Sequence, residues 1–169
     1  MNVRGAPLLA TVALICLTLS LEPTPSQSVP DILNTMAYLQ SSRPTAVNLS
    51  NAMLELAAIL KTVTPFSERD ACGAVRDYAE RLLKEDLETN VSIGEHGSSA
   101  IRELAGSSVM KKETFKLITI CNTGSLATSG HGTALGIART LNSASQLESI
   151  GIMETRPYNQ GSRLTAFEA

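Results

Sequence analysis

The sequence has little net charge and lacks a long run of basic residues. Lys and Arg number 14 against 16 Asp and Glu, which leaves a formal net charge of −2. Proteins that bind nucleic acid usually carry a basic patch or stripe, so the composition argues against nucleic acid as the main partner. A phosphorylated metabolite stays compatible, because a local pocket can be positive on a mildly acidic protein.

Cysteine and histidine are also scarce. The three cysteines lie far apart, at Cys16, Cys72 and Cys121, and the two histidines, His96 and His131, stand alone. No CxxC pair or zinc-ligand spacing occurs, so we predict neither a disulfide scaffold nor a metal site. The pattern fits a reduced, cytosolic protein.

No apolar run is long enough to span a bilayer comfortably. The longest, LLATVALICLTLS, follows Arg4 and precedes the proline-containing segment EPTPSQS. It has two interpretations that the pattern alone leaves open. One is a secretory signal peptide. The other is a buried helix that Pro7 opens and that packs on all sides, which leaves no membrane among the predicted partners.

Apolar residues at helical spacing predict that the N-terminal region, 1–107, is all helical. Hydrophobic residues make up 43% of the chain, enough for a packed core. Pro44 is expected at the first position of a helix, and Ser67 and Asp70 have capping-box spacing ahead of a long amphipathic helix. Cys72 lies on that helix's apolar face, as Cys16 does on the first. The predicted helices are 6–21, 31–40, one from Pro44 to before Pro65, one behind Asp70, and 97–105.

The pattern changes to an α/β type from residue 108 onward. Strands are predicted at about 116–121 and 149–153, separated by a glycine-rich turn and a helix at 133–144. Strand, helix and strand in this order form a βαβ unit, which begins a parallel sheet. Two parallel strands cannot cover themselves, so we expect an exposed apolar face and an incomplete, truncated sheet.

Cys121 ends the first strand, where open α/β folds bind their ligands. A thiol there could donate or accept a proton, although a buried structural cysteine is the alternative. The next residues, Asn122 to Ser125, offer N–H and hydroxyl donors for sugar hydroxyls or phosphate. The alternative for them is a tight connection between strand and helix.

Three arginines, Arg4, Arg43 and Arg156, stand in turn-like contexts, and two of them precede a proline. Proline holds the preceding residue extended, and the guanidinium fork suits phosphate. Taken singly, each arginine is also compatible with a surface or capping role.

Six segments in one order along the chain resemble the methylthioribose-1-phosphate isomerases. They are VRGAP, SRPTAVNL, SIGEHG, CNTGSLAT, GHGTALG and ETRPYNQGSRLTAFE. That family shares a superfamily with ribose-1,5-bisphosphate isomerase and with the alpha, beta and delta subunits of initiation factor two-B. The resemblance implies a helical N-terminal part followed by a Rossmann-like domain, here its beginning at 108–169. It also implies a homodimer in the cytoplasm, with the nucleus as a second location.

The resemblance also implies roles for individual residues. It makes Cys121 catalytic and gives phosphate binding to the Arg4-Gly5-Ala6 turn, Arg43 and Gln160, while Arg156 supports the last loop. The implied partner is a small-molecule sugar phosphate. The implied reaction is an aldose–ketose isomerisation in methionine salvage that needs neither a cofactor nor an obligatory metal.

Three departures from the family pattern accompany the resemblance. The usual N-terminal extension is absent, Ile120 replaces a histidine, and the GADR and NGDTANK segments, which supply an aspartate and a lysine, do not occur. We therefore expect the chain alone not to catalyse the reaction. The alternatives are a non-catalytic regulatory subunit of the translation-initiation exchange factor and a ribose-1,5-bisphosphate isomerase.

Overall fold

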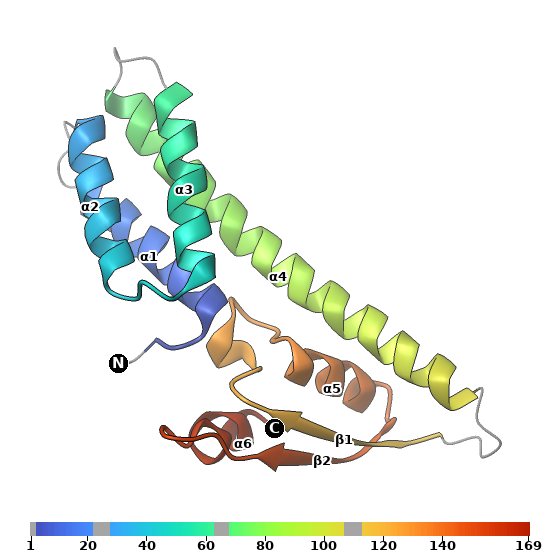
Figure 1. The fold of residues 1–169 in the computed structure, drawn as a ribbon. Coiled ribbons are helices and arrows are strands. Elements are labelled where there is room, and N and C mark those ends of the chain that lie inside the picture. Colours follow the sequence, from blue (N-terminus) through green and yellow to red (C-terminus); the bar gives the residue numbers. More distant parts are fainter. Residues whose placement is uncertain (1–2, 22–27, 63–67, 107–112) are drawn as a thin grey trace. The chain divides into compact units, whose positions relative to one another are not determined.

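The computed structural model describes residues 3–21, 28–62, 68–106 and 113–169 (Figure 1). They divide into two compact units, Met1–Glu85 and Asp86–Ala169, each described here by itself. The boundary predicted at 107/108 stays a prediction. The predicted capping box at Ser67 and Asp70 lies outside the described residues.

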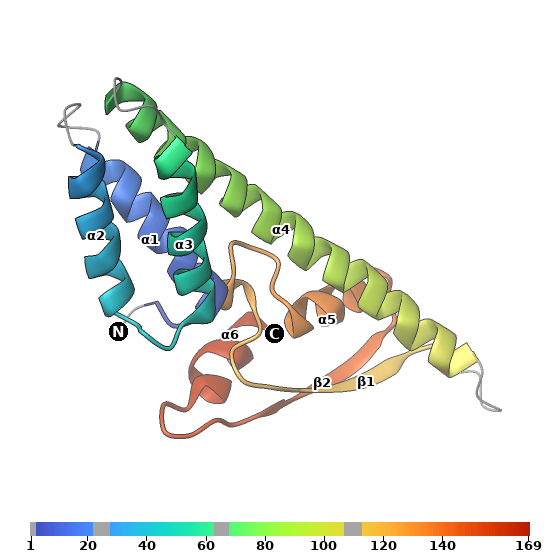
Figure 2. The same ribbon diagram turned by 45° about the horizontal axis from the view of Figure 1, so that its top comes forward.

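The first unit is helical, as predicted. It contains α1 (Ala6–Leu21), α2 (Val29–Ser41), α3 (Val47–Thr62) and the beginning of α4 (Glu68–Gly106). Helices α1, α2 and α3 contact one another and lie side by side in Figures 1 and 2. Helix α2 begins earlier than predicted because Ser28 caps it: the Ser28 hydroxyl oxygen accepts the Asp31 N–H at 3.4 Å and the Asp31 carboxylate accepts the Ser28 N–H at 3.3 Å, in a capping box.

Helix α3 begins later than predicted. Pro44 was expected at its first position, but the helix starts at Val47. Residues 43–46 instead form a turn in which the Ala46 N–H donates to the Arg43 carbonyl at 3.0 Å. Ala46 is buried, so the turn also contributes a side chain to the core of this unit.

Leucine side chains dominate the core of the first unit. Burying one leucine side chain fully is worth about 2 kcal/mol. The prediction that α1 packs on all sides is wrong for this unit, since Ile15, Cys16 and Leu19 are exposed while Leu14 and Leu17 are fully buried. Among the described residues of the unit, the largest fully buried apolar side chains are Leu14, Leu17, Ile32, Leu49, Leu56, Leu60 and Val75.

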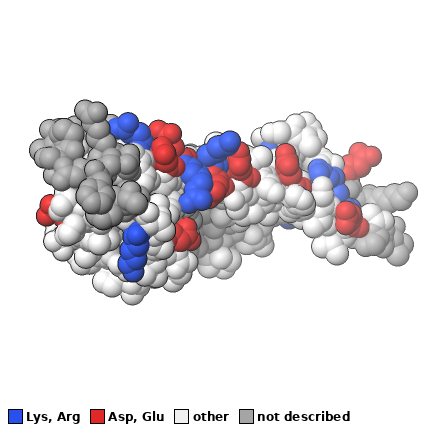
Figure 3. Space-filling model, turned by 90° about the horizontal axis from the view of Figure 1, so that it is seen from above, with Lys and Arg blue, Asp and Glu red and all other residues white. Residues whose placement is uncertain are grey.

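In the described part of the chain, no helix has the combination of length and apolar character that crossing a bilayer requires. Basic and acidic side chains alternate on the face shown in Figure 3, and neither sign forms a continuous patch there. One exposed ion pair on α4 joins Arg81 and Glu85, with 4.0 Å between Nε and Oε1.

Helix α4 is a single helix of 39 residues, so the helix predicted at 97–105 is its C-terminal part. Within the second unit, two α4 glycines allow α5 (Ala134–Ser143) to approach closely. A Cβ atom on Gly94 would meet Thr140 Oγ1 at 2.7 Å, and one on Gly97 would meet Ile137 Cδ1 at 2.5 Å. Helix α5 lies between this part of α4 and the sheet (Figures 1 and 2).

The second unit contains the predicted parallel sheet, which confirms the α/β class with a helical N-terminal part and an incomplete Rossmann-like sheet. Strand β1 (Phe115–Ile120) pairs in parallel with β2 (Leu147–Met153), and Ile120 lies opposite Met153. Ile118 and Ile120 are 78% and 53% exposed, so the predicted exposed apolar face is present in this unit. Short helical turns also occur: η1 (Ser125–Ala127) comes after β1, and η2 (Gly161–Thr165) and α6 (Ala166–Glu168) come after β2.

Candidate functional site

Two loops leave the same edge of the sheet. Cys121 follows the last residue of β1 and Glu154 follows the last residue of β2, and those last residues are register partners. The carboxyl edge of a parallel sheet is where open α/β folds bind ligands. The CNTGSLAT and ETRPYNQG segments thus begin side by side.

Cys121 is exposed, so the alternative of a buried structural cysteine is wrong for this unit. Its φ is +77°, a left-handed backbone that side chains rarely adopt. The fully buried Thr165 hydroxyl donates to the Cys121 carbonyl oxygen at 2.8 Å. A strained residue persists only where its surroundings hold it, and this bond holds the Cys121 backbone in that conformation.

The glycine-rich loop after Cys121 is closed on itself. The Thr133 N–H donates to the Thr123 carbonyl at 2.9 Å, and the Gly132 N–H donates to the buried Thr128 hydroxyl at 3.1 Å. Gly132 has a φ of +86°, which only glycine adopts freely. From α4, the Asp86 carboxylate accepts the Ser129 N–H at 2.7 Å. The loop is therefore built as a compact, hydrogen-bonded turn.

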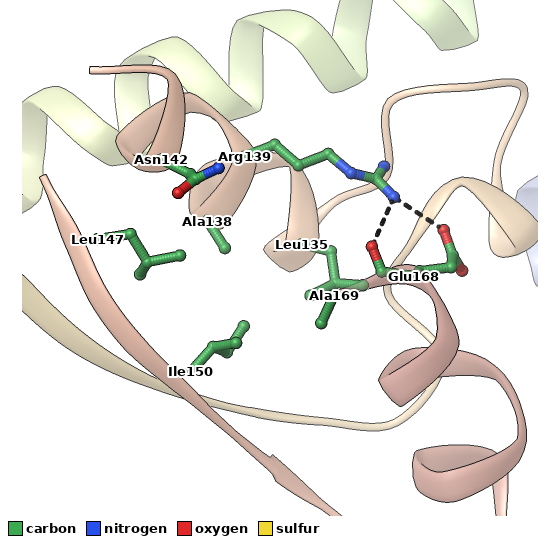
Figure 4. Close-up of a pocket in the computed structure, with 8 residues that line it drawn as sticks. All are labelled: Leu135, Ala138, Arg139, Asn142, Leu147, Ile150, Glu168 and Ala169. Carbon is green, nitrogen blue, oxygen red and sulfur yellow. Dashed lines mark hydrogen bonds and ion pairs between the residues drawn. The ribbon is translucent and has the colours of Figure 1, made fainter. Parts of the chain in front are cut away.

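The Glu168 carboxylate binds the middle of this loop, and Figure 4 shows its contact with Arg139. It accepts the Ser125 N–H and hydroxyl, both at 2.6 Å, the Leu126 N–H at 3.2 Å and Arg139 Nη2 at 3.1 Å. The side chain is only 4% exposed. Burial alone would raise the pKa of Glu168, but the hydrogen bonds from Ser125, Arg139 and Leu126 outweigh it and lower the pKa below its ordinary value.

This arrangement corrects one prediction. Ser125 was expected to offer its donors to sugar hydroxyls or phosphate, but both its N–H and its hydroxyl are already bound to Glu168.

A second carboxylate orders the loop that carries Gln160. Glu154 accepts the Gly161 N–H at 2.8 Å and the Ser162 hydroxyl at 2.6 Å. The hydroxyl of Ser162 and backbone N–H groups of the loop lower the pKa of Glu154. Gln160 is partly exposed, and its N–H donates to Thr155 Oγ1 at 3.2 Å. Gln160 therefore stands in a turn whose backbone is held by hydrogen bonds.

The other predicted phosphate-binding residues lie in the first unit. Arg4 and Gly5 directly precede α1, Ala6 is its first residue, and Arg43 stands in the turn between α2 and α3. The Gly5 carbonyl accepts the Leu9 N–H at 2.9 Å and so begins the helix. The assembly of these residues with Cys121 and Gln160 in one site stays a prediction.

Asn122 follows Cys121 directly. Among the described residues, neither its Oδ1 nor its Nδ2 has a hydrogen-bond partner, and both atoms are shielded from solvent. A buried amide without partners forfeits the hydrogen bonds that water would give it. Asn122 is therefore worth testing for contact with a polar ligand.

A small cavity of about 100 Å³ lies between α5, β2 and the C-terminal helix (Figure 4). Ligand pockets usually measure about 300 Å³ or more, so this cavity is too small for a sugar phosphate. In the ranges that the structure describes, no three His, Cys, Asp or Glu side chains cluster as metal ligands. The cavity is lined by Leu135, Ala138, Arg139, Asn142, Leu147, Ile150, Glu168 and Ala169.

Sequence reasoning missed Thr165, Glu154 and Glu168. All three lie in the ETRPYNQGSRLTAFE segment. No spacing rule could pair Glu168 with Ser125, because 43 residues separate them.

The sequence is similar to a known protein family and to individual known proteins. Residues 2–169 match the Initiation factor 2 subunit family. Over 175 residues the chain is 45% identical to the methylthioribose-1-phosphate isomerase of Fusarium vanettenii, covering 99% of this chain and 45% of that protein.

Two solved structures are also similar. One is 5-methylthioribose 1-phosphate isomerase from Pyrococcus horikoshii, with a TM-score of 0.82 and 30% identity over 99% of this chain and 45% of that one. The other is translation initiation factor eIF-2B, subunit delta, from A. fulgidus, with a TM-score of 0.74 and 33% identity over 98% of this chain and 46% of that one. The chain thus spans less than half the length of each of these relatives.

Proposed function

The chain belongs to the Initiation factor 2 subunit family, and from that membership we propose that its protein is a methylthioribose-1-phosphate isomerase. The substrate is S-methyl-5-thioribose 1-phosphate and the product is the corresponding ribulose 1-phosphate, in methionine salvage. The observation that carries the proposal is an exposed Cys121, held in a strained backbone at the carboxyl end of β1, in a chain 45% identical to such an isomerase.

We assign Cys121 to the acid–base chemistry. An aldose–ketose isomerisation moves hydrogen between C1 and C2 of the sugar, so a group must give or take protons beside those carbons. Cys121 is exposed at the sheet edge, and the Thr165 hydroxyl holds its backbone. A held backbone suits this task because proton transfer depends on geometry within hydrogen-bonding distance.

We assign the substrate phosphate to the Arg4-Gly5-Ala6 turn, Arg43 and Gln160. The guanidinium groups would hold the phosphate oxygens bidentately, and Gln160 would donate from its ordered turn. Binding energy from the phosphate would then position the sugar against Cys121. Because Ser125 already binds Glu168, its donors are not assigned to the phosphate.

Turnover of methylthioribose 1-phosphate tests the main proposal. The chain spans less than half of its relatives, so the assay uses it alone and joined to the remaining part of the Fusarium vanettenii enzyme. We expect turnover in the joined protein and none in the chain alone. A folded joined protein that leaves the substrate unchanged would overturn the proposal.

Cys121→Ser in the joined protein tests the catalytic residue. General acid–base groups contribute a factor of about 100 or more, so turnover should fall at least that far while substrate affinity is kept. Cys72→Ser is the matched control, because Cys72 packs against the helical core of the first unit. Near-normal turnover in Cys121→Ser would remove Cys121 from the mechanism.

Arg43→Ala tests the phosphate assignment. A hydrogen bond to a charged group is worth about 1.5–3 kcal/mol, so substrate affinity should weaken by about that amount. Arg81→Ala is the control, because Arg81 lies on the exposed surface of α4 in an ion pair with Glu85. Unchanged affinity for both substrate and product in Arg43→Ala would make Arg43 purely structural.

A second candidate is a regulatory subunit of the translation-initiation exchange factor. The similarity to subunit delta of eIF-2B from A. fulgidus supports it. Co-purification with exchange-factor subunits, without turnover of the sugar phosphate, would favour this candidate over the isomerase.

We further propose a homodimer in the cytoplasm, with the nucleus as the alternative location. Helix α1 supports retention of the N-terminal segment, because Leu14 and Leu17 are fully buried in the core. Sedimentation of the native protein tests the dimer. Mass spectrometry tests the N-terminus, and a mature end near residues 20–28 would identify the segment as a signal peptide.

A further inference from the structure

We infer that Glu168 is a positioning residue for Cys121, an inference that rests on the proposed isomerase function. Its carboxylate does not reach the thiol through any contact of its own. Instead it holds the turn that begins four residues after Cys121, at Ser125 and Leu126.

The groups that bind the Glu168 side chain are hydrogen-bond donors, which suit a carboxylate. Two backbone N–H groups, one hydroxyl and one guanidinium converge on it, and the side chain is almost completely buried. Gly124 makes room for it, because a Cβ atom there would collide with the Glu168 carboxylate. A charge-assisted set of this kind specifies one position of the loop, since the nearly buried carboxylate would otherwise lose the donors that satisfy it.

The C-terminal segment holds the loop at its beginning and in its middle, and Arg139 of α5 holds it near its end. Thr165 binds the Cys121 carbonyl at the beginning, and Glu168 binds Ser125 and Leu126 in the middle. Arg139 completes the set, since its Nη2 binds Glu168 and its Nη1 donates to the His131 carbonyl at 2.6 Å near the end. The loop from Cys121 to His131 is therefore bound to residues outside itself at its beginning, in its middle and near its end.

Glu168 also fills the place in the loop where an anion would otherwise bind. Converging backbone N–H groups form a concavity that attracts anions, and here the anion is a side chain of the same protein. An external carboxylate should therefore enter this place only when Glu168 is removed.

This behaviour gives a test by chemical rescue, made in the joined protein with Glu168→Ala, Glu168→Gln and added formate. Misplacement of a reacting group by about 1 Å can reduce turnover about 100-fold, so kcat should fall by about 10- to 100-fold while KM changes less than about twofold. Formate should restore part of kcat in Glu168→Ala and have no effect in Glu168→Gln, whose side chain fills the space. Glu148→Ala is the control, because Glu148 forms an exposed ion pair with Lys116.

A second measurement is independent of turnover. Hydrogen exchange at the Ser125 and Leu126 amides should be at least about tenfold faster in Glu168→Ala, and formate should slow it again. If the unaltered joined protein is inactive, the proposed function fails, but these amides still decide whether Glu168 holds the loop. If neither Glu168 variant folds, Ser125→Ala replaces them, because it removes a single donor.

The results of these experiments either support or overturn the inference. Slower turnover with faster amide exchange and formate rescue supports the inference. A purely structural role would leave kcat unchanged in the folded variants, and that result would overturn it. Unchanged amide exchange in Glu168→Ala would overturn it as well.

Discussion

Different kinds of interaction stabilise the interior of each unit. The core cluster of the helical unit is apolar and gathers side chains from all of its helices. In the second unit, buried threonines and the nearly buried Glu168 stand beside a few apolar side chains of α5. The first unit therefore depends on packing, and the second on hydrogen bonds that have to be directed correctly.

This difference shows which unit depends more strongly on the identity of individual side chains. Apolar packing tolerates exchange of one hydrophobic residue for another of similar volume. A buried carboxylate with several donors does not, because each unmatched donor loses a hydrogen bond. The candidate catalytic residue Cys121 lies in the unit of the second kind, where its position is fixed by directed bonds.

The largest effect is expected from Leu56→Ala in α3. Leu56 is 0% exposed, and removing such a side chain leaves a cavity that costs about 2–5 kcal/mol of unfolding free energy. Leu54→Ala in the same helix is the control, since Leu54 is 67% exposed. Denaturant unfolding followed by circular dichroism measures both. Equal effects would contradict the description of an apolar core in this unit.

Gly124→Ala should have the next largest effect, in the second unit. The new methyl group would collide with the Glu168 carboxylate, and overpacking of this kind costs about 1–3 kcal/mol. Gly73→Ala in α4 is the matched control, because nothing lies within 4 Å of a Cβ atom there and alanine favours the helix. Hydrogen exchange of the loop amides should detect the first change and not the second.

Much of the fold could be predicted because it depends on periodic patterns. A continuous apolar run predicted α1, apolar residues at helical spacing predicted α3, and the β-branched run before Cys121 predicted β1. The predictions were wrong where local hydrogen bonds compete with the pattern, as in the turn at 43–46 that delays α3. The pattern also could not show that α4 continues through Gly94 and Gly97, since those glycines serve its approach to α5.

The candidate site could be predicted only in part. The position of Cys121 at the end of a strand follows from the sequence, and its proposed role follows from the resemblance. Its left-handed backbone and the contacts of Glu168 with Ser125 do not, because they depend on residues more than 40 positions apart. Such contacts become predictable only when the sheet that brings the loops together is known.

Extremes of pH should affect the two units in opposite directions. Hydrogen bonds lower the pKa of Glu168 below its ordinary 4.5, so its contribution is present at neutral pH and lost as the pH falls through the folded-state pKa. Burial and a hydrogen bond to Glu55 raise the pKa of Tyr78 above its ordinary 10.0, outweighing the opposing charge of Arg81. The Tyr78 contribution is present below pH 10.0 and lost as the pH rises further.

Hydrogen exchange resolved by unit measures this opposition. The second unit should weaken first in acid and the helical unit first in alkali. Glu168→Gln should flatten the acid dependence of the second unit, and Tyr78→Phe should flatten the alkaline dependence of the first. A common pH profile for both units, unchanged in the two variants, would contradict the distinction between them.

The smallest effect is expected from the ion pair of Lys116 and Glu148, which tests whether burial or charge makes the polar contacts of the second unit important. The pair is as short as the Glu168 contact with Arg139, with 3.0 Å between Nζ and Oε1. Both side chains are more than half exposed, so water screens the attraction and a coupling energy of no more than about 0.5 kcal/mol is expected.

A double-mutant cycle of Lys116→Ala and Glu148→Ala isolates that coupling, and the cycle of Arg139→Ala and Ser125→Ala provides the buried comparison around Glu168. The buried cycle should give the larger coupling, because removing either donor leaves the same carboxylate less satisfied in a place that water does not reach. Equal couplings in the two cycles would mean that charge alone decides, and the contrast drawn between directed, buried bonds and surface pairs would be lost.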